Sequence, residues 1–487
     1  MSAARPPEGA RTAAAGEGRS MRARRAWAAA CMPALLGLGA AQAQEPALSY
    51  EAARVYVLDR SDALAAAQAG VQAKDLQAEG LKRLGGPVLS LGGTAYAYNL
   101  SLGLYLSALN QRVEQLEQRF PPLLQGMLAG LPALPSSYTL RRRDEGANAS
   151  VSALWPIYMG GAADAARGVV QAQGDEARAD AQQAGLEAEA QLAQRYFGAQ
   201  LARRAADLRA RAAETVAQHD QAAQKMLAAG VISRVERLQA LAASEDARRQ
   251  AAKAEDDAQL AATALARSLR MQGAVRPATP LFVLSQPIEP LDFFVEQALA
   301  RHPGLAKVAA KKQQAEQLHA GEEALRRPHL VAFGTRELRS GSADWVAGLS
   351  LRWTLYDAVN RDALAAASLK QVEQAQHTGA QARTDIALLV ERHWRAVENA
   401  RRHFLALQSG EDLALEMQRL RVAGLREGTS TTLDLIDAET NLAKVRTERA
   451  QAANDYVQAL AQLLGSAGLS ERLPDYIARA DIRLDTP

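Results

Sequence analysis

The chain has 487 residues, a formal net charge of +3 and 23% charged residues. Its basic and acidic residues are interspersed rather than gathered in blocks, so nothing indicates a nucleic-acid partner. Aromatic residues make up only 5% of the chain, too few for a conventional large core, whereas its abundant alanine favours closely packed helices.

The N-terminal residues 1–43 have the pattern of an export signal. Three arginines within residues 22–25 precede an apolar run over residues 26–40, and Ala-Gln-Ala at 41–43 offers a cleavage site. The apolar run is too short for a good membrane-spanning helix. Met21 is an alternative start, because the polar sequence upstream of it adds nothing to this pattern.

Cys31, the only cysteine, lies within the apolar run. The sequence around it lacks the leucine three positions earlier that marks a lipid-attachment site, so we expect no lipid anchor. Cleavage after Ala43 would leave the mature protein without a thiol, which excludes disulfides and cysteine chemistry.

The rest of the chain repeats itself. "WPIYMGGAADAARG" from Trp155 matches "WTLYDAVNRDALAA" from Trp353, and "AGVISRVERLQA" from Ala229 matches "EGTSTTLDLIDA" from Glu427, both with an offset of 198 residues. Landmarks upstream share an offset of 241 residues instead. One duplication explains both values if the first copy carries an insertion, at about residues 101–143.

Each copy shows the same order of patterns: a helix, two alternating strands and a pair of very long helices. The leading helices are expected over about 48–83 and 291–327, and glycines break each long helical pair. The first repeat is predicted over 44–271, with strands at about 87–100 and 147–158 and helices over 161–271. A linker over 272–290 leads to the second repeat over 291–465, with strands at about 328–338 and 345–356 and helices over 358–464. A loose tail is expected over 466–487.

The strands have one apolar and one polar face. In "GLSLRWTLYD" from Gly348, Leu349 and Leu351 alternate with Ser350 and Arg352. Strands of about ten residues with this alternation, and with aromatic residues near their ends, are typical of membrane β-barrels. A soluble sheet with one buried face is the alternative interpretation.

Four strands cannot close a barrel. In lipid, each unpaired backbone group at an open edge costs several kcal/mol. The chain must then share its barrel with copies of itself, and three copies supply twelve strands. We therefore predict a mainly α protein with a small β part, in which a trimeric 12-stranded β-barrel is continued by long helices.

The duplicated strand–strand–long-helix-pair layout, together with "LREGTSTTLDLIDAETNLAKVRTERA" from Leu425, resembles the TolC-like outer membrane efflux family. The resemblance implies a homotrimer whose barrel sits in the outer membrane and whose α-helical barrel crosses the periplasm. It implies a passive duct for efflux or type I secretion, docked to a periplasmic adaptor and an inner-membrane pump. A periplasmic coiled-coil adaptor or scaffold without a pore is the alternative function.

The resemblance also assigns a periplasmic gate. It implies that Asp434, Asp437 and Glu236 form an acidic ring that concentrates cations at the mouth. The alternative is that they are ordinary first-turn acids, which the helix dipole favours. Leu425 and Ser430 stand where the best-known family member has an aromatic residue and an arginine that help to hold the mouth shut, so closure by those contacts is not expected here.

The two turns that join the long helices are the expected adaptor-docking tips, because their small residues allow close helix approach. Permissive turns without a partner are the alternative. The docking residues are Gly230, Val231, Ile232, Ser233, Gly428, Thr429 and Ser430.

The insertion at 101–143 has apolar residues at helical spacing, such as Leu109, Val113 and Leu116, and a basic run at Arg141–Arg143. The barrel topology places it outside the cell, where it could cap the pore, pack on the rim or contact lipopolysaccharide. The seven histidines are scattered, without metal-ligand spacing. We predict no catalytic, cofactor or metal site, and no enzyme.

Overall fold

The computed structural model describes residues 47–108, 111–112, 115, 135–338, 344–356 and 358–484. The predicted export signal and most of the predicted insertion lie outside the described residues. The described chain is mostly helical with a small strand part, as predicted. None of its described helices contains a stretch that is long and apolar enough to cross a membrane.

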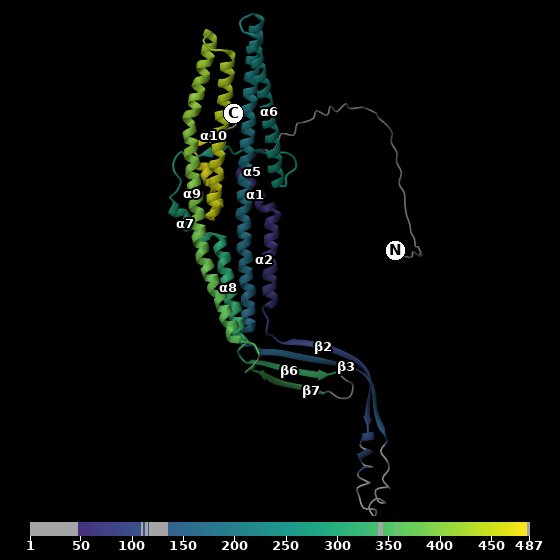
Figure 1. The fold of residues 1–487 in the computed structure, drawn as a ribbon. Coiled ribbons are helices and arrows are strands. Elements are labelled where there is room, and N and C mark those ends of the chain that lie inside the picture. Colours follow the sequence, from purple (N-terminus) through teal and green to yellow (C-terminus); the bar gives the residue numbers. More distant parts are fainter. Residues whose placement is uncertain are drawn as a thin grey trace, which may run out of the picture. The chain divides into compact units, whose positions relative to one another are not determined.

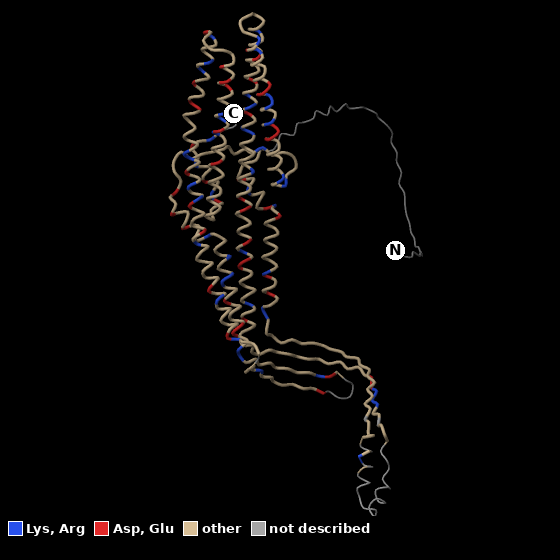
Figure 2. Tube along the Cα trace, in the orientation of Figure 1, with Lys and Arg blue, Asp and Glu red and all other residues tan. Residues whose placement is uncertain are grey.

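Two pairs of long antiparallel helices dominate the fold (Figure 1). The first helices of the pairs have 67 residues each, and the second helices have 35 each. At 1.5 Å per residue, the longer helices extend about 100 Å. Acidic and basic residues are interspersed along all four (Figure 2). The pairs are α5 (Ala162–Ala228) with α6 (Arg234–Ser268), and α9 (Arg361–Glu427) with α10 (Thr432–Ser466).

Each leading helix is broken in two, whereas the sequence pattern predicted one continuous helix. Ser61 leaves the helical conformation, and its side chain accepts a hydrogen bond from Leu64 N at 3.4 Å. His302 precedes Pro303, which disfavours helical backbone before it, and His302 Nδ1 accepts from Gly304 N at 3.0 Å. The resulting helices are α1 (Tyr50–Arg60), α2 (Asp62–Leu81), α7 (Leu291–Arg301) and α8 (Pro303–Ala324).

The main sheet has four antiparallel strands in the order β2-β3-β6-β7. The strands β2 and β3 run further than predicted, into the segment that we interpreted as an insertion, and β7 ends earlier than predicted. Pairing of β3 with β6 ends at Ser150, so the remaining part of β3 pairs with β2 alone. The strands are β2 (Val88–Tyr105), β3 (Ser137–Tyr158), β6 (His329–Glu337) and β7 (Trp345–Arg352).

One face of this four-stranded sheet is apolar and exposed. Leu89 and Leu91 on β2 are each 74% exposed, and Leu349 and Leu351 on β7 are 68% and 71% exposed. The opposite face is more polar: the Ser90 hydroxyl, for example, lies 2.8 Å from that of Ser152 on β3. The alternation predicted from the sequence is thus present, and its apolar side is not covered within the described chain.

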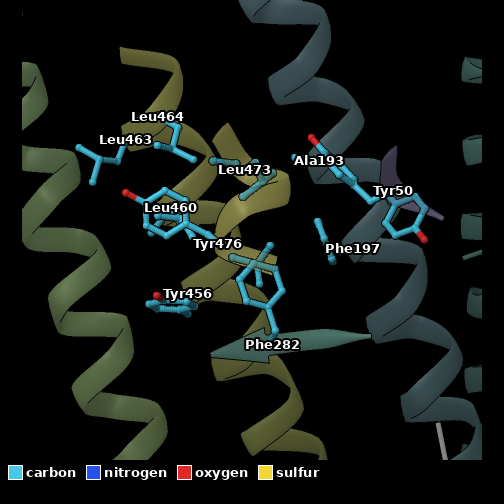
Figure 3. Close-up of a cluster of buried hydrophobic side chains, with 14 of the residues drawn as sticks. Tyr50, Ala193, Phe197, Phe282, Tyr456, Leu460, Leu463, Leu464, Leu473 and Tyr476 are labelled. Carbon is cyan, nitrogen blue, oxygen red and sulfur yellow. The ribbon is translucent and has the colours of Figure 1, made fainter. Parts of the chain in front are cut away.

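A hydrophobic core packs the middle of α5 against the C-terminal half of α10, and Figure 3 shows part of it. Phe282, which is 1% exposed, packs edge-on against Phe197 of α5 and Tyr456 of α10, with ring centroids 5.9 and 6.4 Å apart. Phe282 belongs to β5 (Leu281–Val283), within the predicted linker, which is therefore part of the core.

The C-terminal tail also belongs to this core, so the prediction of a loose tail was wrong. Leu473 and Tyr476 are buried, and Tyr476 Oη donates to Glu289 Oε2 at 2.6 Å. The tail lacks a long periodic pattern, but most of its apolar residues pack in or against the core. Its elements are the 3₁₀ helix η1 (Ser470–Arg472), α11 (Leu473–Arg479) and β8 (Ile482–Leu484), the last paired with β5.

Tyr196 of α5 forms hydrogen bonds with both the start of the described chain and the linker. Its hydroxyl donates to Leu48 O at 2.6 Å and accepts from Thr279 N at 2.8 Å. Next to it, β1 (Ala47–Leu48) pairs in parallel with β4 (Arg276–Pro277). Three segments that are distant in sequence therefore meet on one tyrosine.

Candidate functional site

The first tip, between α5 and α6, turns on Gly230. This residue has φ +73°, a left-handed conformation that side chains rarely adopt. Val231 N donates to Met226 O at 2.9 Å and so satisfies a carbonyl at the end of α5. The turn therefore requires glycine for its geometry, whatever else binds there.

The second tip, between α9 and α10, is built in the same way. Gly428 also has φ +73°, and Thr429 N donates to Gly424 O at 2.8 Å. Ser430 N donates to the same carbonyl at 3.1 Å. The structure thus places both predicted tip glycines at equivalent turns.

A reciprocal capping box follows each glycine. In the first, Glu236 N donates to Ser233 Oγ at 3.2 Å, while Ser233 N donates to Glu236 Oε2 at 2.7 Å. In the second, Asp434 N donates to Thr431 Oγ1 at 3.1 Å, while Thr431 N donates to Asp434 Oδ2 at 2.9 Å. Two of the three predicted gate acids therefore also hold helix starts.

These hydrogen bonds change the acidity of both carboxyl groups. The bonds from the Ser233 backbone and hydroxyl lower the pKa of Glu236, and those from the Thr431 backbone and hydroxyl lower the pKa of Asp434. Arg421 Nη1, 3.7 Å from Asp434 Oδ1, acts in the same direction. Both tips therefore keep a negative charge fixed at the helix start.

Asp437 differs from the other two acids. It is exposed, lies one turn beyond Asp434 on α10, and within the described chain no hydrogen bond or ion pair holds its carboxylate. It lines a hollow of about 210 Å³ between α5, α6 and α10, which Arg209 and Lys444 also line. Of the three predicted acids, Asp437 is therefore the one whose carboxylate does not cap a helix.

The two tips offer different surfaces to a partner. On the first, Val231, Val235 and Leu238 are 67%, 65% and 55% exposed and follow one another at helical spacing in the sequence. Ile232, in contrast, is partly buried and packs against a small apolar cluster that includes Ala223 and Ile436. On the second, the turn carries the polar residues Thr429, Ser430 and Thr431. The sequence pattern predicted both turns but did not reveal the exposed apolar stripe that follows the first one.

A half-buried ion pair ties the first hairpin together just below its tip. Arg237 of α6 pairs with Asp220 of α5. The second hairpin combines the Arg421–Asp434 ion pair with a neutral–charged contact, in which Gln418 Nε2 donates to Glu439 Oε1 at 2.7 Å. The Ser-x-x-Glu spacing could have revealed the first capping box from the sequence, but nothing in the spacing reveals this ion pair.

Two of the histidines lie within hydrogen-bonding distance of a serine on a neighbouring helix. His319 Nδ1 lies 2.8 Å from Ser368 Oγ, between α8 and α9, and His393 Nδ1 lies 3.1 Å from Ser466 Oγ, between α9 and α10. Over the described ranges, no group of three or more His, Cys, Asp or Glu side chains is placed to hold a metal ion.

Solved structures share this fold at low sequence identity. The outer membrane protein VceC from Vibrio cholerae is 13% identical, with a TM-score of 0.68 over 86% of this chain and 96% of VceC. The CmeC outer membrane channel of Campylobacter jejuni is also 13% identical, with a TM-score of 0.68 over 88% of both chains. The MtrE outer membrane channel of Neisseria gonorrhoeae is 17% identical, with a TM-score of 0.66 over 86% of this chain and 89% of MtrE.

No curated protein sequence matches the chain. The sequence profile of the outer membrane efflux protein family, in contrast, matches residues 55–269 and 294–469. This match spans most of the chain and confirms the resemblance inferred from the strand pattern and the second tip. The protein belongs to the outer membrane efflux protein family.

Proposed function

We propose that the protein is a passive outer membrane duct, formed by three copies of the chain, through which an export machine passes its cargo out of the periplasm. The sheet is the observation that carries this proposal. It has an exposed apolar face, and its outer strands β2 and β7 each have a neighbour on one side only within the described chain.

Such a sheet is unstable alone in either solvent. In water it exposes leucines, and in lipid its open edges leave backbone groups unpaired at several kcal/mol each. Pairing β7 of one copy with β2 of the next removes both problems. Three copies then give twelve strands, an even number within the known range of outer membrane barrels.

The helices support the same assembly. Apolar side chains on α9, such as Leu388 and Leu413, are 60% and 65% exposed, which suits contacts with helices of other copies. The matched lengths of α5 with α9 and of α6 with α10 support an internal duplication. Two similar hairpins per copy would give a ring of six, which can continue the barrel as a helical tube through the periplasm.

The tips are the proposed entrance. In a trimer, Asp434, Asp437 and Glu236 would form rings of carboxylates that concentrate cations. The exposed stripe that begins at Val231 and the polar turn at Thr429 and Ser430 are the proposed docking surface for a periplasmic adaptor, which would connect the duct to an inner-membrane pump. Efflux and type I secretion both fit such a duct, because the pump selects the cargo.

The test is to purify the mature protein from outer membranes in detergent, measure its mass, and reconstitute it in planar bilayers. The proposal expects a trimer that forms discrete, long-lived conducting steps. A scaffold without a pore would give no conductance, and a water-soluble monomer would rule out the duct. The family match already favours a channel over a scaffold.

A further inference from the structure

The exposed leucines of β2 change sides along the strand. Near the helices, the exposed leucines are Leu89 and Leu91, on odd-numbered positions of β2. Further out, they are Leu100 and Leu102, on even-numbered positions, 64% and 59% exposed. Because successive side chains of a strand point to opposite faces, the two sets lie on opposite faces of the ribbon.

In the outer stretch, β3 adds a leucine to the face that carries Leu100 and Leu102 of β2. Leu140, which is 52% exposed, pairs with Leu102, so both lie on the same face. The opposite face of this stretch carries polar residues from both strands: Asn99 pairs with Arg143, and Ser101 pairs with Arg141. In this outer stretch, the exposed leucines of both strands therefore share one face.

The change coincides with the loss of the neighbouring strands. Strand β6 stops pairing with β3 at Ser150, so within the described chain residues 98–105 and 137–144 form a two-stranded ribbon. Eight residues extend about 26 Å at strand rise. A two-stranded ribbon is marginally stable in water, and this one also exposes apolar side chains, so it needs a covering partner.

We propose that the outer ribbons of three copies pack their Leu100, Leu102 and Leu140 faces against one another on the barrel axis and so close the outer mouth. This inference rests on the proposed trimer. If the Leu89 and Leu91 face contacts lipid, the opposite face lines the lumen, and the outer leucines continue that inner face. The partner that three-fold symmetry brings to this face is the same ribbon of another copy.

The charges fit this arrangement. Arg141 and Arg143 lie on the outward face, where water and phosphate-bearing head groups are found. On the inward face, Arg142 and Asp144 are two positions apart on β3, so an arginine of one copy can meet an aspartate of the next. The leucines would then form an apolar constriction, which stops ions by excluding water, at the end of the duct opposite the tips.

The first test is cross-linking in a Cys31→Ser background, in which the chain has no cysteine. Leu102→Cys should form disulfide-linked dimers on mild oxidation, or on addition of a short bismaleimide. The three cysteines of a trimer can form only one pair, so at most about two thirds of the chains can be cross-linked into dimers. Ser101→Cys, the adjacent residue on the opposite face, is the control and should remain monomeric on denaturing gels.

The second test is conductance. Leu100→Asn combined with Leu102→Asn and Leu140→Asn should wet the constriction and raise the single-channel conductance severalfold. The control, Ser101→Asn with Thr139→Asn on the opposite face, should leave it unchanged.

Conducting trimers without a Leu102 cross-link, or with equal cross-links from both positions, would overturn this inference and leave the proposed duct intact. Unchanged conductance of the triple variant would also overturn it. Absence of trimers would overturn both the inference and the proposed function.

Discussion

The core and the main sheet handle apolar surface in opposite ways. In the core, side chains from α5, β5, α10 and α11 meet within one chain, and Phe282 is 1% exposed. In the sheet, Leu351 is 71% exposed although it sits in a regular strand. One region completes its fold alone, whereas the other leaves apolar side chains that lipid would cover in the proposed trimer. The difference separates residues that hold the chain together from residues that would build the proposed duct.

Breaking the core should have the largest effect. Phe282→Ala removes a ring packed between Phe197 and Tyr456 and should destabilise the chain by about 3–5 kcal/mol. Denaturant unfolding in detergent, followed by the helical circular dichroism signal, measures this loss. Leu76→Ala on α2, where the leucine is 67% exposed, is the matched control. Equal midpoints for the two variants would contradict the role given to the core.

Breaking the sheet should affect assembly but not helix content. Leu349→Arg puts a charge on the face proposed to contact lipid, at about 2–4 kcal/mol if the position is near the bilayer midplane. Heat-stable trimers in outer membranes should decrease, while the helical signal of the purified chain persists. Ser350→Arg, one position along and on the opposite face, should assemble normally. If Ser350→Arg reduced the amount of trimer and Leu349→Arg did not, the face assigned to lipid would be wrong.

Changing the tip acids should leave both regions intact and alter only permeation. Asp437→Asn together with Asp434→Asn should lower the preference for cations severalfold, because two of the proposed rings lose their charge. The ratio of cation to anion permeability in planar bilayers measures this. Asp256→Asn, an exposed acid within α6 and away from the tip, is the control. An unchanged permeability ratio in the double variant would contradict the proposal that these residues form an acidic ring.

The smallest predicted effect is on pH dependence. The caps lower the pKa of Asp434 and Glu236, so their charges should persist as the pH falls below the ordinary carboxyl range. The stabilisation from the caps is present above the unfolded pKa values and is lost as the pH falls through the lowered folded values. Cation selectivity should therefore decline at a lower pH than for a free carboxylate. Glu236→Gln keeps a capping side chain and should weaken selectivity at every pH at which Glu236 is charged.

The sequence predicted the regular parts of this fold because they are periodic. Alternation revealed the strands, and the glycines revealed both tips. The burial of Phe282 and Tyr476 could not be seen, because three-residue strands and a seven-residue helix carry no measurable period. The outer ribbon was not predicted because the leucines of β2 change there from odd to even positions, and such a break in the alternation indicates the end of a strand. The capping role of Glu236 could be predicted from its spacing to Ser233, whereas the ion pair between Asp220 and Arg237 could not be predicted from the sequence.

The number of strands per chain also decides which assemblies can form. Strands β2, β3, β6 and β7 alternate in direction, so β7 of one copy can join β2 of the next as antiparallel neighbours, and every junction in a closed ring is alike. This contact is head-to-tail. A two-fold pair of β2 edges would instead send the helices of its two copies to opposite sides of the membrane. Strand parity alone thus favours a cylinder with all its helices on one side over a symmetric dimer.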